Sequence, residues 1–588
     1  MNLKRHIFEH FKIIIRYFIQ TMKNSFSYLF LLTILAFSIS ALNQVEASDV
    51  SNDDLINYSE HESPKLVIGL IVDQMRPDYI YRYWDLYGEG GIKRLATEGA
   101  VFRNAYFKHL QTSTGPGYGT SMTGASPNVH GLIGNSWYVR ELDRTINVIE
   151  AVDHDFAGVG SQEDYNGRKW PGNMLTTTVG DELFLHSGER TKSIGISRKD
   201  RGAILPAGHT GHAYWYESAT GNFITSTYFR DELPGWMEEF NNRNLPQEYL
   251  SGSWDPFHPI EEYVQSRPDN NPYEGTFADV EEPVFPGDLA VIVEEFELSP
   301  GILNMTPFAD KLLLELAKAA IEGEELGQRD VPDILNIGLS AADAIGHRFG
   351  PGSKQVQDYY LRLDRYFADF FDYLDETLGM ENVLIYLTSD HGAVYIPEYL
   401  SSLGIPTGHD GLETGPNSYI TGNISIFMEE KWGEDFLLTY NNQNVYLDHA
   451  FIEEAGLDLE QVRIDIKRFV LTLDSVGGAI TADALNRNEF RDGMHARAMH
   501  SFHQKRSGDV VVWLEPHTRG GSPVGGTGHG TGWVYDTHAP LIFMGMDIEA
   551  RQIYDKAYVS DIASTIAIFL ISPFPCGNIG NPLNGLME

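Results

Sequence analysis

Aspartate and histidine residues follow several apolar runs in this sequence, at points where strands would end. Asp73 follows LVIGLIV, Asp343 follows ILNIGLSAA, and Asp390 with His391 follow VLIYLTS. Such side chains on the rim of a buried sheet are what a two-metal hydrolytic site needs. Convergence of these residues would indicate a metallohydrolase, whereas scattered positions would indicate an ordinary α/β protein.

Further histidines are candidates for completing such a site. His347 follows Asp343 by four residues, which places both on one face of a helix, although a capping Asp and a solvated His give the same pattern. His529 lies among glycines in GGTGHGTG, a flexible loop that permits close approach. His538, in YDTHAP, competes with it for the last ligand position.

Hydroxyl and basic residues indicate phosphoryl chemistry. Thr114 lies in the Gly- and Pro-bent stretch 112–120, where a hydroxyl is presented and following backbone N–H groups face an anion. Six hydroxyl residues lie between positions 112 and 123, so the stretch itself selects none of them. Lys199 and Arg201 follow the run SIGIS and point the same way on an extended segment. They either bind oxygens of one phosphoryl group or belong to a solvated turn.

The elements that must position these residues alternate between strands and helices. Apolar strands are expected at 65–72, 101–107, 193–197, 333–340, 383–389, 509–515 and 539–545. Helices are expected at 79–99, 174–188, 312–327, 354–378 and 559–570. This alternation predicts an α/β fold with a mainly parallel central sheet covered on both faces. Residues 206–300 and 403–508 do not follow this alternation of strands and helices, and they are expected to be insertions into one domain spanning 65–588.

The charge and cysteine content exclude several classes of protein. The 588-residue chain has a formal net charge of -39, which disfavours nucleic-acid binding and requires concentrated positive charge to attract an anionic substrate. Bound metal ions would supply that charge. Cys576 is the single cysteine, so an intramolecular disulfide and a thiolate zinc site are both excluded.

The N-terminus has the pattern of a targeting segment. A basic start at Met22-Lys23 precedes the apolar run SYLFLLTILAFSISAL and the small residues before Ser48. This pattern predicts a secretory signal peptide over 1–47, with Met22 as an alternative start and an uncleaved anchor as the alternative interpretation. Residues 48–64 form a polar leader. We expect a periplasmic or secreted protein without membrane association after cleavage.

The order of the motifs resembles the alkaline phosphatase superfamily, and within it the secreted alkaline phosphatases of the PafA type. The resemblance extends from about Lys65 to the C-terminus. It is carried by IVDQMRPD, TGPGYGTSMTGASPNVHGLIGNSW, ISRKDRGAILPAGH, ADAIGHRFGP, TSDHGA and GTGHG…YDTHAPLIF. It implies a three-layer alkaline phosphatase-like sandwich that binds two Zn2+ ions.

The resemblance also implies a role for each candidate residue. Thr114 would be the nucleophile and form a phosphothreonine intermediate. One zinc ion would be held by Asp73, Asp390 and His391, and the other by Asp343, His347 and His529. The phosphoryl oxygens would be bound by Asn135, Lys199 and Arg201. Gly115 and Tyr118 depart from the usual Ala and His, which implies a changed pocket with activity retained.

The expected function is that of a monomeric, secreted, metal-dependent alkaline phosphatase that releases phosphate from small-molecule monoesters. A nucleotide pyrophosphatase/phosphodiesterase of the same superfamily is the closest alternative, although Lys199 and Arg201 argue against it. A catalytically dead secreted binding protein on this fold, with 206–300 as its interaction surface, is the alternative from another class. A sulfatase is disfavoured because the chain has no Cys/Ser-x-Pro-x-Arg motif.

Overall fold

The computed structural model describes residues 63–278, 280–408, 415–519, 525–546 and 548–586. They fall in one compact unit, Ser63–Glu588. The predicted signal peptide and all but the last two residues of the polar leader lie outside the described residues. Within the described ranges, no helix is both long and apolar enough to cross a membrane.

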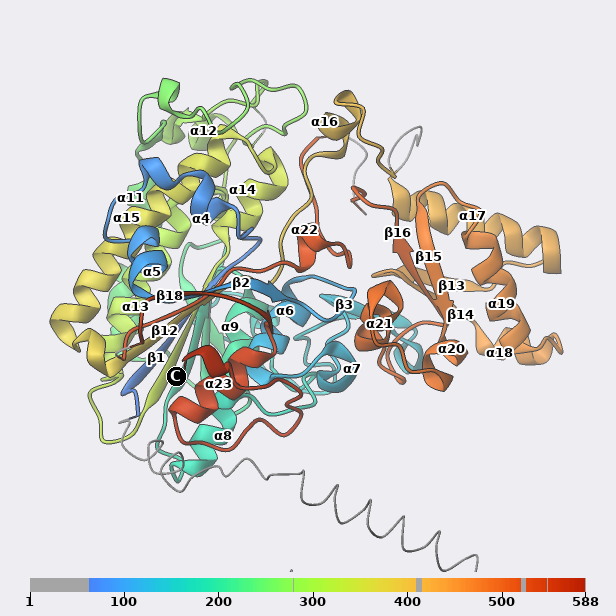
Figure 1. Cartoon of the computed structure of the whole chain (residues 1–588), viewed down its shortest axis with the longest axis horizontal. Coiled ribbons are helices and arrows are strands. Elements are labelled where there is room, and N and C mark those ends of the chain that lie inside the picture. The colour runs from blue at the N-terminus through green and yellow to red at the C-terminus, as the bar shows by residue number, and fades with distance from the viewer. Residues whose placement is uncertain (1–62, 279, 409–414, 520–524, 547, 587–588) are drawn as a thin grey trace, which may run out of the picture. The chain divides into compact units, whose positions relative to one another are not determined.

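A ten-stranded mixed sheet forms the centre of the described fold, in the order β18-β2-β17-β12-β1-β11-β6-β7-β8-β5 (Figure 1). The five neighbours from β12 to β7 run parallel, and β17 and β8 are antiparallel to the strands beside them. The strands are β1 Leu66–Val72, β2 Ala100–Tyr106, β5 Gly158–Val159, β6 Ser193–Ser197, β7 His212–Tyr216, β8 Phe223–Ser226, β11 Asp333–Leu339, β12 Val383–Thr388, β17 Leu541–Met544 and β18 Arg551–Tyr558.

Helices cover both faces of this sheet, because its central strands are apolar on both sides. In β1, Ile68 and Leu70 belong to one buried core and Val67 and Ile71 to the opposite one. The first core is covered by α5 Ile92–Glu98, α13 Phe308–Gly323 and α15 Lys354–Thr377. The second is covered by α6 Thr114–Thr123, α8 Val179–His186, α9 Asp200–Ala207 and α23 Asp561–Phe569. The predicted three-layer α/β class is confirmed.

Two local expectations differ from the structure. The helix expected over 79–99 is broken into α4 Tyr79–Arg82 and α5, because the chain turns around the Asp364 carboxylate. That carboxylate accepts hydrogen bonds from Gly88 N at 2.8 Å and Ile92 N at 2.7 Å. Secondly, β7 and β8 lie within 206–300 yet pair with the central sheet, so this part of the segment is not an insertion. Its Tyr and Trp residues are buried strand residues.

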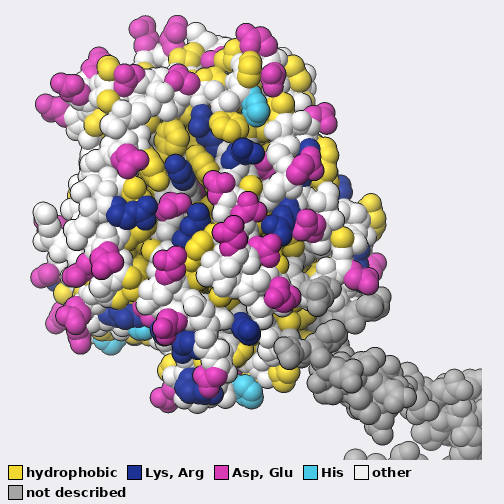
Figure 2. Space-filling view, turned by 90° about the vertical axis from the view of Figure 1, so that its left-hand side faces the viewer, with side chains coloured by type: hydrophobic (Ala, Val, Ile, Leu, Met, Phe, Trp, Pro, Cys, Tyr) yellow, Lys and Arg dark blue, Asp and Glu magenta, His cyan; other side chains and the backbone are white. Residues whose placement is uncertain are grey.

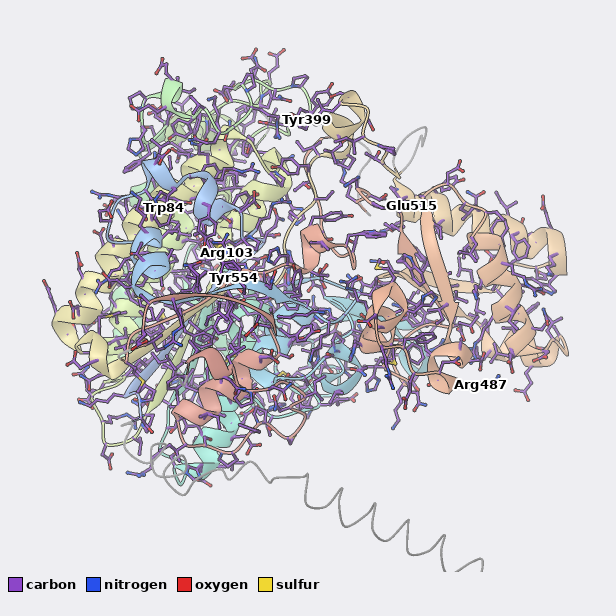
Figure 3. The ribbon with its side chains drawn as sticks, in the orientation of Figure 1. Trp84, Arg103, Tyr399, Arg487, Glu515 and Tyr554 are labelled. Carbon is purple, nitrogen blue, oxygen red and sulfur yellow. The ribbon has the colours of Figure 1, made fainter. Side chains whose placement is uncertain are left out.

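A separate four-stranded antiparallel sheet is formed by three strands of the segment 403–508 and by the strand expected at 509–515, which therefore does not join the central sheet. Its order is β13-β14-β16-β15, and it packs its own apolar core against α17 and α19. We call this part, residues 416–514, the small-sheet subdomain. Its elements are α17 Pro416–Trp432, β13 Leu437–Asn441, β14 Asn444–Leu447, α18 His449–Glu454, α19 Leu459–Val470, β15 Val476–Thr481, α20 Ala482–Arg487, α21 Gly493–Ser501 and β16 Val510–Leu514. Figure 3 labels Arg487, the last residue of α20, and Glu515, which directly follows β16.

Shorter elements complete the described chain. They are α7 Pro127–His130, β3 Ser136–Val139, β4 Arg144–Asn147, α10 Gly235–Asn242, α11 Leu245–Leu250, β9 Ser253–Trp254, β10 Gly287–Asp288, α12 Leu289–Glu295, α14 Ala341–Phe349, α16 Pro397–Ser402 and α22 Val534–Thr537.

A charge network around the buried Asp509 joins the small-sheet subdomain to the rest of the fold. Asp509 contacts Arg140, which follows β3, at 2.8 Å, Arg463 at 2.6 Å and His449 at 2.8 Å. Burial would raise the pKa of Asp509, but His449, Arg140 and Arg463 lower it to about 2. Asp509 therefore stabilises the fold as a carboxylate.

Asp509→Asn is expected to lower the free energy of unfolding by about 1–3 kcal/mol at neutral pH, because it removes the charge of a buried carboxylate that three partly exposed cationic groups contact. Since the folded pKa lies below the ordinary value, the contribution is present above about pH 4 and is lost as the pH falls through 2. Urea unfolding from pH 7 to pH 2 measures this. Asp483→Asn, which removes a partner of Arg463 alone, is the control and should have a smaller effect. Equal losses in both variants would contradict the central role of Asp509.

Candidate metal centre

Neighbouring parallel strands bring the predicted carboxylates to one edge of the central sheet. Asp73 directly follows β1, and Asp390 lies two residues beyond β12. Asp343 lies in α14, which begins two residues after β11. Because β11 and β12 both pair with β1 in parallel, their carboxyl ends meet. The convergence that the strand pattern predicts is therefore present.

Asp73, Asp390 and His391 form a fully buried group of potential metal ligands. His391 Nε2 lies 3.4 Å from both Asp73 Oδ1 and Asp390 Oδ2, and none of these three atoms has a hydrogen-bond partner among the described residues. His391 Nδ1 donates to the Gly392 carbonyl at 3.0 Å, which leaves the lone pair on Nε2. Three electron-pair donors facing one another in a buried space fit a divalent cation.

A second group of donors surrounds Asp343. The Nε2 atoms of His347 and His529 lie 3.1 Å and 3.6 Å from Asp343 Oδ1. His347 Nδ1 donates to the Thr527 carbonyl and His529 Nδ1 to the Thr112 carbonyl, each at 2.9 Å. Both rings therefore direct Nε2 toward the carboxylate, and with neutral imidazoles this arrangement also fits a metal ion.

The group around Asp73 and the group around Asp343 are in direct contact, although their residues come from separate sequence motifs. The rings of His391 and His529 are stacked with centroids 3.5 Å apart. Asp343, His391 and His529 have donor atoms within 4.8 Å of one another, whereas His347 lies at the exposed side of this group. The predicted trios thus appear in the structure as one continuous cluster that shares His391.

His538, the competing candidate, lies away from both groups. Its Nε2 donates to the Arg103 carbonyl at 3.1 Å, and its ring stacks on Tyr106 with a centroid distance of 4.6 Å. Neither group of potential ligands includes it. Of the two histidines left open by the sequence, His529 is the one beside Asp343.

Burial and neighbouring charges set the protonation of this cluster. Burial, with the charge of Asp73, raises the pKa of Asp390 well above its usual range. Burial would also raise the pKa of Asp343, but His347 and Lys199 hold it well below that range. Burial lowers the pKa of His529 well below its ordinary value, and the neighbouring His391 adds to this. A neutral imidazole is the form that binds a metal.

Thr114 and Lys199 face the cluster from the N-terminal ends of two helices. Lys199, the residue before α9, has its Nζ 2.5 Å from Asp73 Oδ2 and 2.6 Å from Asp343 Oδ2. The same Nζ lies 3.5 Å from the hydroxyl of Thr114, the first residue of α6. The N-terminus of α6 carries partial positive charge, which favours an anion beside Thr114.

Asn135 contacts the N-terminal end of α6. Its Oδ1 accepts a hydrogen bond from Gly115 N at 2.7 Å, so its NH2 group is turned away from that contact. Gly117 permits the close approach of α6 to the segment after β12, because a Cβ there would lie 2.3 Å from the Asp390 carbonyl oxygen. Tyr118 is fully buried, with its hydroxyl 3.5 Å from the Ile71 carbonyl.

Gln74 is a residue of the cluster that the sequence reasoning did not select. Its Nε2 donates to Asp343 Oδ1 at 2.8 Å and its backbone N to Asp390 Oδ1 at 3.2 Å, so it connects both groups. It adopts φ 64°, an uncommon conformation for a residue with a side chain. Gly346 makes room for it, since a Cβ there would lie 2.0 Å from Gln74 Oε1. Gly346, between Asp343 and His347 in the sequence, could have indicated that another side chain packs closely against this helix.

The two basic residues predicted to act together after β6, Lys199 and Arg201, have different surroundings in the structure. Lys199 reaches the cluster, whereas the described charge contact of Arg201 is with Asp200 at 3.9 Å. Arg198, which the sequence reasoning passed over, donates to the Ser340 carbonyl at 3.3 Å. Burial lowers the pKa of Arg198, and the charge of Asp343 opposes that shift.

A cavity of about 730 Å3 opens beside the cluster. His347 and His529 line one side of it. The turn between β13 and β14, with Asn441, Asn442 and Gln443, lines another. The small-sheet subdomain therefore forms part of the wall of the space next to the metal centre, where a substrate fits.

Comparisons with known proteins show the family of this chain. The family model described as type I phosphodiesterase / nucleotide pyrophosphatase matches residues 67–534. Alkaline phosphatase PafA of Elizabethkingia meningoseptica is 36% identical over 524 residues, covering 88% of this chain and 94% of that protein. Alkaline phosphatase PhoV of Synechococcus elongatus is 37% identical over 528 residues, covering 89% and 93%.

A crystal structure of wild-type PafA has the same fold, with a TM-score of 0.84 at 35% identity over 90% of this chain and 99% of that one. The resemblance inferred from the motifs is confirmed. The chain belongs to the type I phosphodiesterase / nucleotide pyrophosphatase family of the alkaline phosphatase superfamily, where it is similar to PafA and PhoV.

Proposed function

We propose that this chain is a phosphate monoesterase in which Thr114 attacks phosphorus beside two zinc ions. The observation that carries the proposal is the position of Lys199 Nζ, which contacts Asp73 and Asp343 and lies 3.5 Å from the Thr114 hydroxyl. A nucleophile, a cation and two groups of potential ligands thus surround one point. The similarity to PafA and PhoV, both named alkaline phosphatases, supports the same activity.

Asp73, Asp390 and His391 would hold one zinc ion, and Asp343, His347 and His529 the other. Carboxylates and neutral imidazoles are ligands that zinc accepts. Zinc, when bound, would supply positive charge that favours an ionised hydroxyl and a negatively charged leaving group.

The protein's own groups would then direct a double displacement. Thr114 Oγ forms a bond to phosphorus as the bond from phosphorus to the leaving oxygen breaks, and the alcohol departs. Water cleaves the resulting phosphothreonine, releases inorganic phosphate and restores the hydroxyl. Lys199, the Asn135 NH2 group and Arg201 would bind the phosphoryl oxygens, and the positive N-terminus of α6 would favour their charge.

The closest competing function is phosphodiester hydrolysis, which the family description includes. A diester carries one negative charge and a second organic group, so an ammonium ion at the phosphoryl position favours a monoester. Comparing p-nitrophenyl phosphate with bis(p-nitrophenyl) phosphate tests the assignment. Faster hydrolysis of the diester overturns it, and a zinc-loaded protein that releases no phosphate would instead be a binding protein.

Lys199→Ala is expected to lower kcat/KM for the monoester by about 10²-fold and to affect the diester less, because it removes a charge that the dianion uses more. Steady-state kinetics on both substrates measure the ratio, with zinc content determined in parallel. Lys192→Ala, which removes a lysine paired with Glu324, is the matched control and should leave the ratio unchanged. An unchanged ratio in Lys199→Ala contradicts the assigned role.

The proposal also includes export and a monomeric state. The segment 1–47 has the pattern of a signal peptide, so we infer a periplasmic or secreted enzyme that acts on small-molecule monoesters.

A further inference from the structure

A second group of basic side chains surrounds a pocket of about 500 Å3 outside the metal centre. The pocket is lined by four cationic residues and one carboxylate, that of Asp492. The cations are Lys108, Arg491, Arg497 and Lys556. They come from three distant parts of the chain: the segment after β2, the start of α21 and the end of β18.

This concentration of positive charge is unusual for the chain, whose formal net charge is -39. On the face drawn in Figure 2, acidic and basic side chains are interspersed. Around the pocket, by contrast, no ion pair with a carboxylate within 4.0 Å involves these four cations, as far as the described residues extend. Lys108 and Lys556 lie over the Tyr558 ring at 4.1 Å and 5.1 Å, and Arg497 contacts Met494 Sδ at 3.8 Å.

Burial increases the energetic cost of this arrangement. Burial lowers the pKa of the Arg497 guanidinium, which indicates that its charge is partly removed from water. His500, which also lines the pocket, has a buried Nδ1 without a hydrogen-bond partner. Asp561 lies near Lys108, but it accepts hydrogen bonds from the backbone N of Tyr558 and Asn581. Like charges held together in this way are stabilised when an anion lies among them.

We propose that this pocket binds a small polyvalent oxyanion of the phosphate or sulfate ester class. Lysine and arginine are the side chains that bind such groups, and Gly493 in the first turn of α21 adds a helix N-terminus to the lining. The volume exceeds that of a single phosphate, so the expected ligand carries several anionic groups on a compact scaffold. This site is separate from the proposed hydrolysis and does not depend on it.

The site also contacts the segment that leads to the proposed nucleophile. Lys108 lies six residues before Thr114, and Leu110 N in the same segment donates to the Arg497 carbonyl at 3.1 Å. A bound anion would therefore connect this segment to α21 and to β18. Since the anion binds the folded chain but not the unfolded chain, it is also expected to raise the melting temperature.

Isothermal titration of the zinc-loaded full-length protein with inositol hexasulfate, a polyanion without phosphate esters, tests the proposal. We expect one saturable site in the wild type and a Kd that is about tenfold or more weaker in Lys108→Gln/Arg497→Gln. Lys505→Gln/Arg468→Gln removes two positive charges elsewhere and should change Kd by less than about twofold. The kcat/KM for p-nitrophenyl phosphate should remain at the wild-type value in Lys108→Gln/Arg497→Gln.

Several outcomes would overturn the proposal. They are the absence of saturable binding, equal weakening in the control variant, and loss of binding in Lys199→Ala with retention in Lys108→Gln/Arg497→Gln. Displacement by inorganic phosphate at equal concentration would overturn the polyvalent assignment. If Lys108→Gln/Arg497→Gln unfolds, Arg491→Gln/Lys556→Gln, which changes exposed positions, replaces it with the same expected weakening.

Discussion

Replacing Thr114 by Ala is expected to lower kcat for p-nitrophenyl phosphate by about 10³- to 10⁶-fold, the range for loss of a catalytic nucleophile. Thr114 is buried at the start of α6, and its hydroxyl is the one that contacts Lys199. Among the described hydrogen bonds of residues 112–123, only that of the Thr114 hydroxyl involves Lys199. Steady-state kinetics at saturating zinc measure the loss, and acid-quenched phosphoenzyme should disappear in the variant.

Neighbouring hydroxyls provide the control, since the sequence left the choice among them open. The Thr112 hydroxyl donates to the Thr531 carbonyl at 2.8 Å, and no described contact joins it to Lys199. Thr112→Ala should therefore retain phosphoenzyme formation, and Thr114→Ser should retain part of the activity. A Thr114→Ala protein with wild-type kcat, or phosphate trapped on another residue, would contradict the assignment.

Replacing His529 by Ala is expected to weaken the binding of one metal ion by about 10²-fold or more and to lower activity in parallel. The variant removes the Nε2 donor that lies 3.6 Å from Asp343 Oδ1. Its Nδ1 contact with the Thr112 carbonyl is also lost, which releases the loop before Thr114. Metal content after dialysis against a weak chelator, together with kcat, measures both effects.

His538→Ala is the matched control. It also replaces a histidine of the C-terminal part of the chain, but this histidine lies away from the metal centre. His538 contacts the Arg103 carbonyl and the Tyr106 ring, so its loss should leave the metal content unchanged. Metal loss in His538→Ala with full metal content in His529→Ala would exchange the two assignments. Loss of metal in neither variant would remove His529 from the ligand set.

The strands that carry the site could be predicted from the sequence. β1, β11 and β12 are predominantly apolar and buried along their whole length because both faces of a covered parallel sheet are buried. Each run ends near an aspartate, and parallel strands place such residues at one edge. The long helix α15 was equally predictable, since its apolar residues recur at helical spacing.

Other features depended on contacts between distant residues. The helix expected at 79–99 is broken because Asp364, on a helix far along the chain, accepts hydrogen bonds from Gly88 and Ile92. The aromatic residues of β7 lack alternation because the strand is buried on both faces, so the segment resembled an irregular insertion. The contribution of the turn between β13 and β14 to the cavity likewise depends on how the small-sheet subdomain packs.

The sequence by itself determined which donors are available: carboxylates and imidazoles at strand ends, and a lone cysteine that excludes thiolate ligands. The tertiary structure alone decided that His529 rather than His538 lies beside Asp343, that His391 is shared by both groups, and that Gln74 connects them. The reason is physical. Periodicity reports whether a residue is buried within its own element, whereas a metal centre depends on the distances between donors from elements hundreds of residues apart.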